Sequence, residues 1–331
     1  MKIFYLINCL NKNGLGHITR GLLLANSLKK QKIYVQFLLI NGTISSKKIL
    51  KEHNIISINS NNQKTIAKEI NYTSNKKDIR HLIIDHYSLK DTFFKTLDSK
   101  IKKISICDGN IKPNNYDMIF DQSLTFKKSQ KIFSAVRFLI LKKKPFTLRK
   151  KYSLHFSNKL KISLFFGAYL SNFKLTNIIN SINIIRKPGD KFYFYLISNN
   201  TKDNLHSNIL KKDKIFMNLN SNKFLKEVSK SDLGVGEGGN AAIERYIIGL
   251  PSLNFLTNDN QKKILNLPLN KKMFFINKNK YKNTIRFYQK ELNDFFSKFR
   301  KKNLSLKANI KIKFDSNGSM RIAQIIKKLY I

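Results

Sequence analysis

The chain alternates short apolar runs with longer amphipathic stretches from one end to the other. The apolar runs have the length of strands that are buried on both faces, and the stretches between them have helical spacing. This alternation predicts parallel β-sheets that are covered by helices on both sides. In the first half of the chain, strands are expected at residues 2–8, 33–40, 55–58, 81–85, 103–107 and 118–120. In the second half, they are expected at residues 161–166, 191–197, 214–217, 233–235 and 252–255.

The alternation is interrupted at residues 142–157, a charged stretch with little periodicity that contains Pro145. The length of 331 residues is sufficient for roughly two domains of about 150 residues each. We therefore predict an α/β protein with two Rossmann-like domains, residues 1–148 and 149–331, and a closing helix at residues 316–329. In such folds ligands bind outside the carboxyl ends of the strands, so the binding site is expected in the cleft between the domains.

The charge balance is strongly basic, with 63 Lys and Arg against 20 Asp and Glu and a formal net charge of +43. Lysines are nevertheless scattered through every segment, and the longest basic runs, such as Lys142–Lys144 and Arg149–Lys151, are short. Surfaces that read nucleic-acid phosphates usually concentrate Arg on one face. We therefore expect no specific nucleic-acid partner, but a preference for anionic substrates such as nucleotide sugars. Contact with an anionic membrane surface stays open.

The cysteines and the apolar runs also restrict the class of protein. Cys9 and Cys107 provide neither a disulfide framework nor the spacing of a zinc site. No apolar run approaches the roughly 18 residues of a transmembrane helix, and Asn8 interrupts the apolar start too early for a signal peptide. We expect a cytoplasmic protein without a transmembrane segment, a metal or a cofactor. The oligomeric state is left open.

The loop after the first predicted strand contains Gly14 and Gly16, followed by His17 and Arg20. The two glycines permit a tight turn and close approach of a ligand. His17 would lie at the start of the next helix, where the positive end of the helix dipole favours a neutral ring that can accept a proton. The alternative is that His17 only caps that helix, and the loop by itself does not decide between the two.

A second glycine-rich loop follows the predicted strand at residues 233–235. It reads Gly236-Glu237-Gly238-Gly239-Asn240, and a helix that contains Glu244 comes next. Free N–H groups at the start of that helix can receive a diphosphate, and Glu244 can accept hydrogen bonds from ribose hydroxyls. A plain strand-to-helix turn is the alternative. The loop is not a Walker loop, because no Gly-Lys-Ser or Gly-Lys-Thr follows.

Polar residues also follow other predicted strands. Asp85, His86 and Tyr87 end one strand, while Asp108 and Asp121-Gln122 end two later ones. Because the carboxyl ends of parallel strands share one edge, these side chains are expected to converge, although helix capping is the alternative role. Asn260 and Gln261 lie in an amide-rich loop that can bind sugar hydroxyls or cap a helix.

With these motifs, nearly the whole chain resembles the UDP-sugar hydrolases of the pseudaminic acid pathway. Those enzymes release UDP from UDP-2,4-diacetamido-2,4,6-trideoxy-β-L-altropyranose, and they are similar in fold to MurG-type glycosyltransferases. The resemblance implies two Rossmann-like domains in a GT-B arrangement with an interdomain cleft. The motifs that carry it are residues 14–20, 84–89, 117–122, 236–245, 249–251 and 260–261.

The resemblance also implies roles for individual residues. His17 matches the general base for a water that attacks the anomeric carbon, and Tyr87 and Asn260 match positions that support the water and the sugar. The other substrate and UDP contacts would be Gly14, Gly16, Arg20, Asp85, Gly236, Gly238, Gly239, Asn240, Glu244 and Gln261. No metal is implied.

The chain departs from the family at Phe166-Gly167-Ala168-Tyr169, where the family usually has Gly-Gly-x-Asp, and at Lys142-Lys143, where it usually has Gly-Pro. Such changes are also expected in a relative that acts on another UDP-linked amino sugar. The main hypothesis is metal-independent hydrolysis of a UDP-linked diacetamido-trideoxy sugar in nonulosonic acid biosynthesis. The first alternative is a GT-B glycosyltransferase that uses a UDP-sugar donor in cell-surface polysaccharide synthesis. The second is a non-catalytic protein that binds polyanions.

Overall fold

The computed structural model describes residues 1–8, 16–86, 89–109, 111–149, 159–167, 172–196, 210–256, 261, 265, 267–269, 271, 273–277, 284–300 and 315–330. The chain forms two compact units. Unit 1 consists of Met1–Lys142, Leu265–Leu267 and Lys313–Ile331, and unit 2 of Lys143–Ile264 and Pro268–Ile312. The chain enters unit 2 at Lys143, and its last helix belongs to unit 1.

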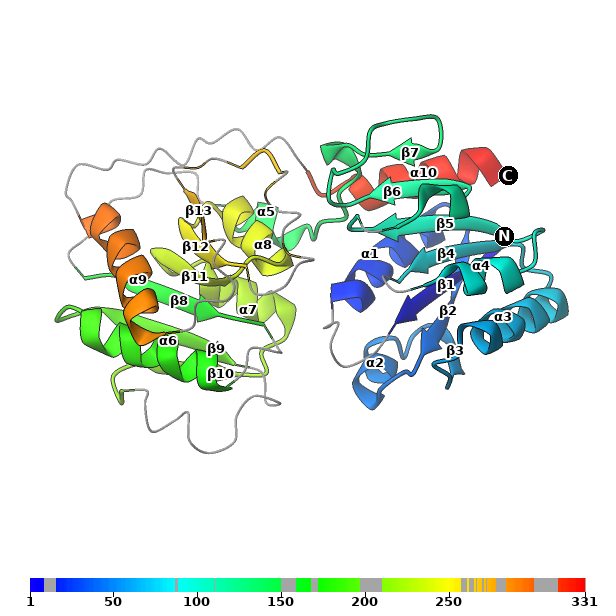
Figure 1. Ribbon diagram of the computed structural model, residues 1–331. Helices are drawn as coiled ribbons and strands as arrows, with labels where there is room; N and C mark the ends of the chain where they lie inside the picture. Colours follow the sequence, from blue (N-terminus) through cyan, green and yellow to red (C-terminus); the bar gives the residue numbers. More distant parts are fainter. Residues whose placement is uncertain are drawn as a thin grey trace. The chain divides into compact units, whose positions relative to one another are not determined.

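Unit 1 is built on a parallel sheet with the strand order β3-β2-β1-β4-β5-β6-β7 among the described residues (Figure 1). The strands are β1 (Lys2–Asn8), β2 (Tyr34–Ile40), β3 (Asn54–Ile58), β4 (His81–Asp85), β5 (Lys102–Cys107), β6 (Met118–Asp121) and β7 (Ile132–Phe133). The helices are α1 (Gly16–Lys30), α2 (Ile44–Ile49), α3 (Gln63–Lys77), α4 (Asp91–Thr96), α10 (Gly318–Tyr330) and the short 3₁₀ helices η2 (Pro113–Asn115) and η3 (Val136–Phe138).

Strand β1 shows why the central strands are continuously apolar. Ile3, Tyr5 and Ile7 pack into one hydrophobic cluster with α1 and α10, whereas Phe4 and Leu6 pack into a second cluster with α3 and α4. Successive side chains of a strand point to opposite faces, so a strand between two helical layers needs apolar residues at every position.

The last helix is attached to unit 1 through specific contacts with earlier segments. The hydroxyl of Ser27 on α1 donates to the hydroxyl of Ser319 at 2.9 Å. A Cβ atom at Gly318 would lie 2.0 Å from the carbonyl oxygen of Leu139, so this close approach requires glycine. Ile322 and Ile326 of α10 are fully buried in the cluster that contains α1. The sequence predicted this helix within a second domain of residues 149–331, whereas in the structure it packs on unit 1.

Unit 2 repeats the same plan, with a parallel sheet in the order β10-β9-β8-β11-β12-β13 among the described residues. The strands are β8 (Lys161–Phe165), β9 (Lys191–Leu196), β10 (Lys214–Met217), β11 (Leu233–Glu237), β12 (Ser252–Phe255) and β13 (Phe274–Asn277). The helices are α5 (Lys144–Thr147), α6 (Asn172–Ile185), α7 (Ser221–Val228), α8 (Asn240–Ile248) and α9 (Ile285–Arg300). Helices α6 and α9 cover one face of the sheet, and α7 and α8 pack on the other.

The predicted strands are confirmed, with ends that shift by a few residues at most; residue 197 lies outside the described residues. Two strands at sheet edges, β7 and β13, were not predicted. Strand β7 is only two residues long, and β13 lies between Lys- and Asn-rich stretches that hide its apolar pattern. None of the described helices is long and apolar enough to cross a membrane.

Both sheets reverse their strand order at one place, between β1 and β4 in unit 1 and between β8 and β11 in unit 2. The connections from the two strands at such a point run to opposite sides of the sheet, which leaves a crevice at the carboxyl ends of the strands. The two glycine-rich loops and the Asp85 motif follow β1, β11 and β4, whereas the other selected residues follow β5, β6 and β12. Each unit therefore presents its own candidate site.

Candidate active site

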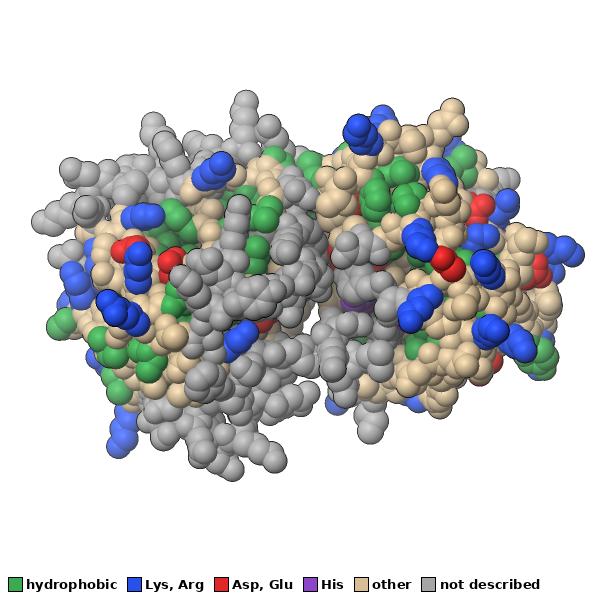
Figure 2. All heavy atoms as spheres, in the orientation of Figure 1, with side chains coloured by type: hydrophobic (Ala, Val, Ile, Leu, Met, Phe, Trp, Pro, Cys, Tyr) green, Lys and Arg blue, Asp and Glu red, His purple; other side chains and the backbone are tan. Residues whose placement is uncertain are grey.

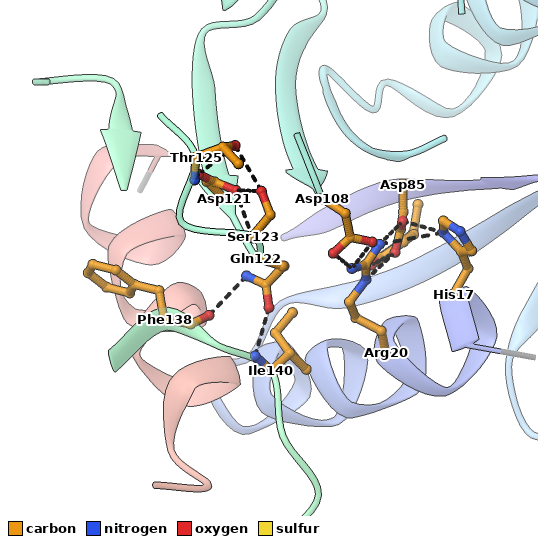
Figure 3. Close-up of polar contacts among 11 residues, drawn as sticks. His17, Arg20, Asp85, Asp108, Asp121, Gln122, Ser123, Thr125, Phe138 and Ile140 are labelled. Carbon is orange, nitrogen blue, oxygen red and sulfur yellow. Dashed lines mark hydrogen bonds and ion pairs between the residues drawn. The ribbon is translucent and has the colours of Figure 1, made fainter. Parts of the chain in front are cut away.

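The unit 1 site lies where β1 and β4 are neighbours. Asp85 is the last residue of β4 and pairs with Ile7 across the two strands. His17 and Arg20 lie three residues apart in the first turns of α1, so their side chains leave the helix on the same side. Figure 3 shows both side chains directed at the carboxylate of Asp85. The His17 and Asp85 motifs, which are far apart in the sequence, are therefore brought together.

Asp85 is completely buried and accepts hydrogen bonds on both oxygens. Its Oδ1 is 2.5 Å from Nδ1 of His17 and 2.5 Å from Nη2 of Arg20. Its Oδ2 accepts from Nε of Arg20 at 2.9 Å and from the hydroxyl of Tyr5 at 3.2 Å. The carboxylate is thus fixed by donors from β1 and α1.

Arg20 continues this network to a second carboxylate. Its Nη1 donates to both oxygens of Asp108, at 2.9 and 3.0 Å, just beyond the end of β5. All three guanidinium nitrogens are therefore engaged by carboxylates, and the residue is only 6% exposed. Arg20 was expected to contact the substrate. In the structure it links the carboxylates of Asp85 and Asp108, and its contact with the substrate stays a prediction.

The protonation states in this cluster follow from its burial and its charges. Burial by itself would raise the pKa of Asp85, but the charges of Arg20 and His17 and their hydrogen bonds lower that pKa to about 2. Burial, together with the nearby charge of His17, lowers the pKa of His86 to about 4. Burial and the carboxylate of Asp85 raise the pKa of Tyr5 well above its ordinary value. At neutral pH, Asp85 is ionised while His86 and Tyr5 are neutral.

These states fix the tautomer of a neutral His17. An ionised carboxylate can only accept hydrogen bonds, so the proton between His17 and Asp85 belongs to Nδ1. The lone pair of the ring is then on Nε2. A histidine held in this way can remove a proton from a bound hydroxyl group, and the adjacent carboxylate stabilises the imidazolium that forms.

Asp121 and Gln122, although they also follow a strand, have structural roles. Asp121 accepts from the backbone N–H groups of Ser123 and Thr125 at 2.8 and 2.6 Å, which fixes the turn after β6. The amide of Gln122 donates to the carbonyl of Phe138 at 3.0 Å and accepts from the N–H of Ile140 at 2.8 Å (Figure 3). These are the capping and turn roles that the sequence left as the alternative.

The unit 2 site lies at the carboxyl end of β11 and the start of α8. Gly239 caps the helix with extended backbone angles and leaves open space around its α-carbon, with no atom within 4 Å of an added Cβ. Asn240, the first residue of α8, is exposed, and Glu244 follows one turn later on the same side of the helix. The first N–H groups of a helix have no partner within the helix. This end of α8 can therefore accept an anion, with Glu244 beside it.

The other two glycines of this loop have structural roles. A Cβ atom at Gly236 would lie 1.9 Å from the carbonyl oxygen of Phe165 on the adjacent strand β8. The N–H of Gly238 donates to the carbonyl of Phe255 on β12 at 3.0 Å. Both residues were expected to contact UDP. In the structure Gly236 allows close packing of two strands and Gly238 forms a backbone hydrogen bond, while their contacts with UDP stay predictions.

The side chain of Arg245 explains why β11 ends in small residues. Arg245 was not named as a site residue from the sequence. Its side chain lies over this strand, where a Cβ atom at Gly234 would be 2.6 Å from its Cδ. Its Nη2 donates to the carbonyl of Glu237 at 3.0 Å and to the side chain of Asn254 at 2.6 Å. Burial lowers the pKa of Arg245 to about 10. The Gly-x-Gly spacing of β11, followed by a helical Arg, was the available signal.

The remaining predicted residues fall into two groups. Gly16 is the exposed first residue of α1, and Gln261 is buried and donates to the carboxylate of Glu237 at 3.3 Å. Gly14, Tyr87 and Asn260 lie outside the described residues. Within the part of the chain that is described, no three His, Cys, Asp or Glu side chains are grouped to hold a metal ion.

The fold belongs to the GT-B class, with two parallel-sheet α/β domains. The chain is similar in structure to UDP-GlcNAc 2-epimerase of Methanocaldococcus jannaschii, with a TM-score of 0.66 and 14% identity over 99% of this chain and 100% of that one. It is also similar to MurG of Acinetobacter baumannii, with a TM-score of 0.65 and 11% identity over 99% and 100% of the two chains. A glycosyltransferase of Rickettsia africae has a TM-score of 0.62 and 16% identity over 99% and 97%. Neither a protein-family model nor a curated protein sequence matches the chain.

Proposed function

We propose that the protein hydrolyses a UDP-linked amino sugar, with His17 as the general base. The observation that carries this proposal is the contact between Nδ1 of His17 and the buried carboxylate of Asp85. Beside an ionised carboxylate, a neutral His17 carries its proton on Nδ1 and its lone pair on Nε2. This is the arrangement that a base needs in order to accept a proton from water.

In the proposed reaction, Nε2 of His17 accepts a proton while the water oxygen forms a bond to the anomeric carbon. The bond between that carbon and the phosphate oxygen breaks, and UDP leaves with the electron pair from the opposite face of the sugar. The products are UDP and a free sugar of inverted anomeric configuration. His17 then releases its proton to solvent.

The nucleotide would be held by unit 2. The start of α8 at Gly239 and Asn240 supplies N–H groups and the positive end of a helix dipole for the diphosphate. These donors stabilise the charge that develops on the leaving group, which is why we propose a reaction without a metal ion. Glu244 would accept hydrogen bonds from the ribose. Several proteins of similar fold carry UDP or UDP-GlcNAc, among them the M. jannaschii epimerase and the S. aureus protein MnaA.

The proposed sugar is the diacetamido-trideoxy sugar of the hydrolases that the sequence resembles. Tyr87 and Asn260 would support the water and the sugar, as the resemblance implies. The alternative is a glycosyltransferase, favoured by the structural likeness to MurG and to the R. africae enzyme. In that case the same Nε2 would deprotonate a hydroxyl group of an acceptor instead of water.

The test is the release of UDP from a panel of UDP-linked amino sugars, with a chelator present and no acceptor. Turnover in H₂¹⁸O, followed by NMR and mass spectrometry, should place the label on the anomeric carbon of the sugar and not on UDP. His17→Ala should abolish release, while His53→Ala, a partly exposed histidine of the same unit, should not. Release that requires an added acceptor would favour the transferase, and an unchanged rate in His17→Ala would exclude His17 as the base.

A further inference from the structure

We propose that Asp108 is a positioning residue that sets the basicity of His17 through Arg20, a proposal that rests on the proposed role of His17 as the base. Asp108 follows β5, the strand next to β4, and its carboxylate is 2% exposed. It lies 88 residues from Arg20 in sequence. Arg20 links two carboxylates, those of Asp85 and Asp108. Of these two, Asp85 makes the contact with His17 that is described above.

The first part of the argument is orientation. Arg20 grips Asp85 side-on, with Nε on one oxygen and Nη2 on the other. Its Nη1 points away from Asp85 and is held by both oxygens of Asp108. A planar guanidinium that is fixed at both ends cannot rotate without breaking several charged hydrogen bonds. Asp108 therefore fixes the guanidinium of Arg20, which in turn orients the carboxylate of Asp85 toward His17.

The second part is charge. Asp85 and Asp108 each contribute one negative charge and Arg20 contributes one positive charge, so the three together carry −1 while His17 is neutral. Among the described residues, His86, Tyr5 and Cys107 also lie near this cluster, and all three are neutral because burial disfavours their charged forms. The buried cluster therefore becomes neutral only when His17 takes up a proton. Unbalanced charge is costly in a buried site, and a proton on His17 would balance the charge of this cluster.

The same count predicts what happens when Asp108 loses its charge. In Asp108→Asn, the cluster is neutral while His17 is neutral, and it becomes positive when His17 takes up a proton. The side-chain amide of this variant has one oxygen in place of two, so the hydrogen bonds that Nη1 of Arg20 donates to residue 108 also weaken. Proton uptake by His17 should therefore move to lower pH. A purely structural role of Asp108 would reduce stability without this shift.

The first experiment is the pH profile of kcat/KM. In Asp108→Asn, the acid limb should move to lower pH by about one pH unit, and the plateau should fall because a weaker base removes the proton less readily. Asp108→Glu keeps the charge and should restore the wild-type limb. Asp91→Asn is the matched control, since it removes the same charge from an exposed ion pair with Lys112 in the same unit. Its profile should coincide with that of the wild type.

The second experiment does not depend on turnover. Histidine side-chain NMR of the free protein can follow proton uptake, with His17 assigned by the signal that is missing in His17→Gln. The midpoint for His17 should be lower by about one pH unit in Asp108→Asn and unchanged in Asp91→Asn. Asp108→Ser is a smaller neutral variant with the same expected shift, in case the amide prevents folding.

The two readouts separate the two proposals. If no UDP is released by the wild type but the midpoint shifts as expected, the hydrolase proposal fails and the role of Asp108 stands. If Asp108→Asn or Asp108→Ser folds and His17 titrates as in the wild type, or at higher pH, the role of Asp108 is overturned. A shift of the same size in Asp91→Asn would overturn it as well.

Discussion

Nδ1 of His17 lies 2.5 Å from Oδ1 of Asp85, and both side chains are buried at the carboxyl end of β4. The substitution Asp85→Asn keeps the shape of this contact but replaces an acceptor with a group that can also donate. His17 would then no longer be held as the Nδ1–H tautomer. We expect kcat for UDP release to fall by roughly 10² to 10⁴, measured at neutral pH. Asp91→Asn serves as the control for loss of a carboxylate, and an Asp85→Asn enzyme of normal rate would contradict the proposed base.

The depressed pKa of Asp85, about 2, also predicts how stability depends on pH. A carboxylate with a lowered pKa in the folded state adds stability above its unfolded pKa of about 3.9, and that stability is lost as the pH falls toward the folded value. The shift corresponds to about 2 kcal/mol. The stability advantage of the wild type over Asp85→Asn should therefore narrow as the pH is lowered from about 5 to about 3.

Urea unfolding of both proteins at constant ionic strength measures this difference in the free energy of unfolding. The control is Asp91→Asn, because Asp91 is exposed and its ion pair with Lys112 is open to solvent. Its stability curve should run nearly parallel to that of the wild type. A gap between the wild type and Asp85→Asn that stayed constant or widened toward low pH would contradict the depressed pKa.

The parallel strands were predictable because burial on both faces leaves a strong apolar signal. Strand β1 is an example, with Ile3 and Phe4 in clusters on opposite faces of the sheet. Edge strands such as β7 lack that signal. The fold explains the convergence of His17 and Asp85, since both follow strands that meet where the strand order reverses.

The partners of individual polar groups could not be read from the sequence. Asp85 and Asp121 both end parallel strands, yet Asp85 faces His17 whereas Asp121 binds the N–H groups of its own turn. Arg20 is likewise a plausible ligand contact by its position, and only the fold reveals Asp108 on its far side. Such pairings depend on distances between segments, which spacing along one strand or helix does not determine.

Scattered charge was the reason to expect no specific nucleic-acid partner. On the face of the molecule drawn in Figure 2, the Lys and Arg side chains of the described residues form separate small groups and not a continuous stripe. That view agrees with the distribution of lysine along the chain. The absence of a specific nucleic-acid partner remains a prediction.

Substitution by alanine should affect the stability of the protein very differently at two glycines of the same loop. In Gly236→Ala, the added methyl group would lie 1.9 Å from the carbonyl oxygen of Phe165, which should reduce the free energy of unfolding by about 3 kcal/mol. In Gly239→Ala, the methyl group meets nothing within 4 Å, so stability should change by less than about 1 kcal/mol.

The second glycine should instead affect nucleotide binding. If the start of α8 holds the diphosphate, a methyl group at residue 239 should raise the Kd for UDP roughly tenfold, because it obstructs close approach to the helix N–H groups. Thermal unfolding and calorimetric titration with UDP measure the two effects. Equal destabilisation by both substitutions would contradict the geometry, and unchanged UDP affinity in Gly239→Ala would argue against the diphosphate site.

The attachment of the last helix to unit 1 can be tested at Gly318. An alanine there would place its Cβ 2.0 Å from the carbonyl oxygen of Leu139, so α10 would have to move away from that segment. Since Ile322 and Ile326 share a cluster with α1, this movement exposes apolar surface of unit 1 only. Hydrogen exchange should therefore increase in α1 and β1 of Gly318→Ala, while α9 of unit 2 keeps the protection of the wild type. Gln324→Ala, an exposed substitution on the same helix, should change neither, and loss of protection in α9 would show that α10 supports unit 2.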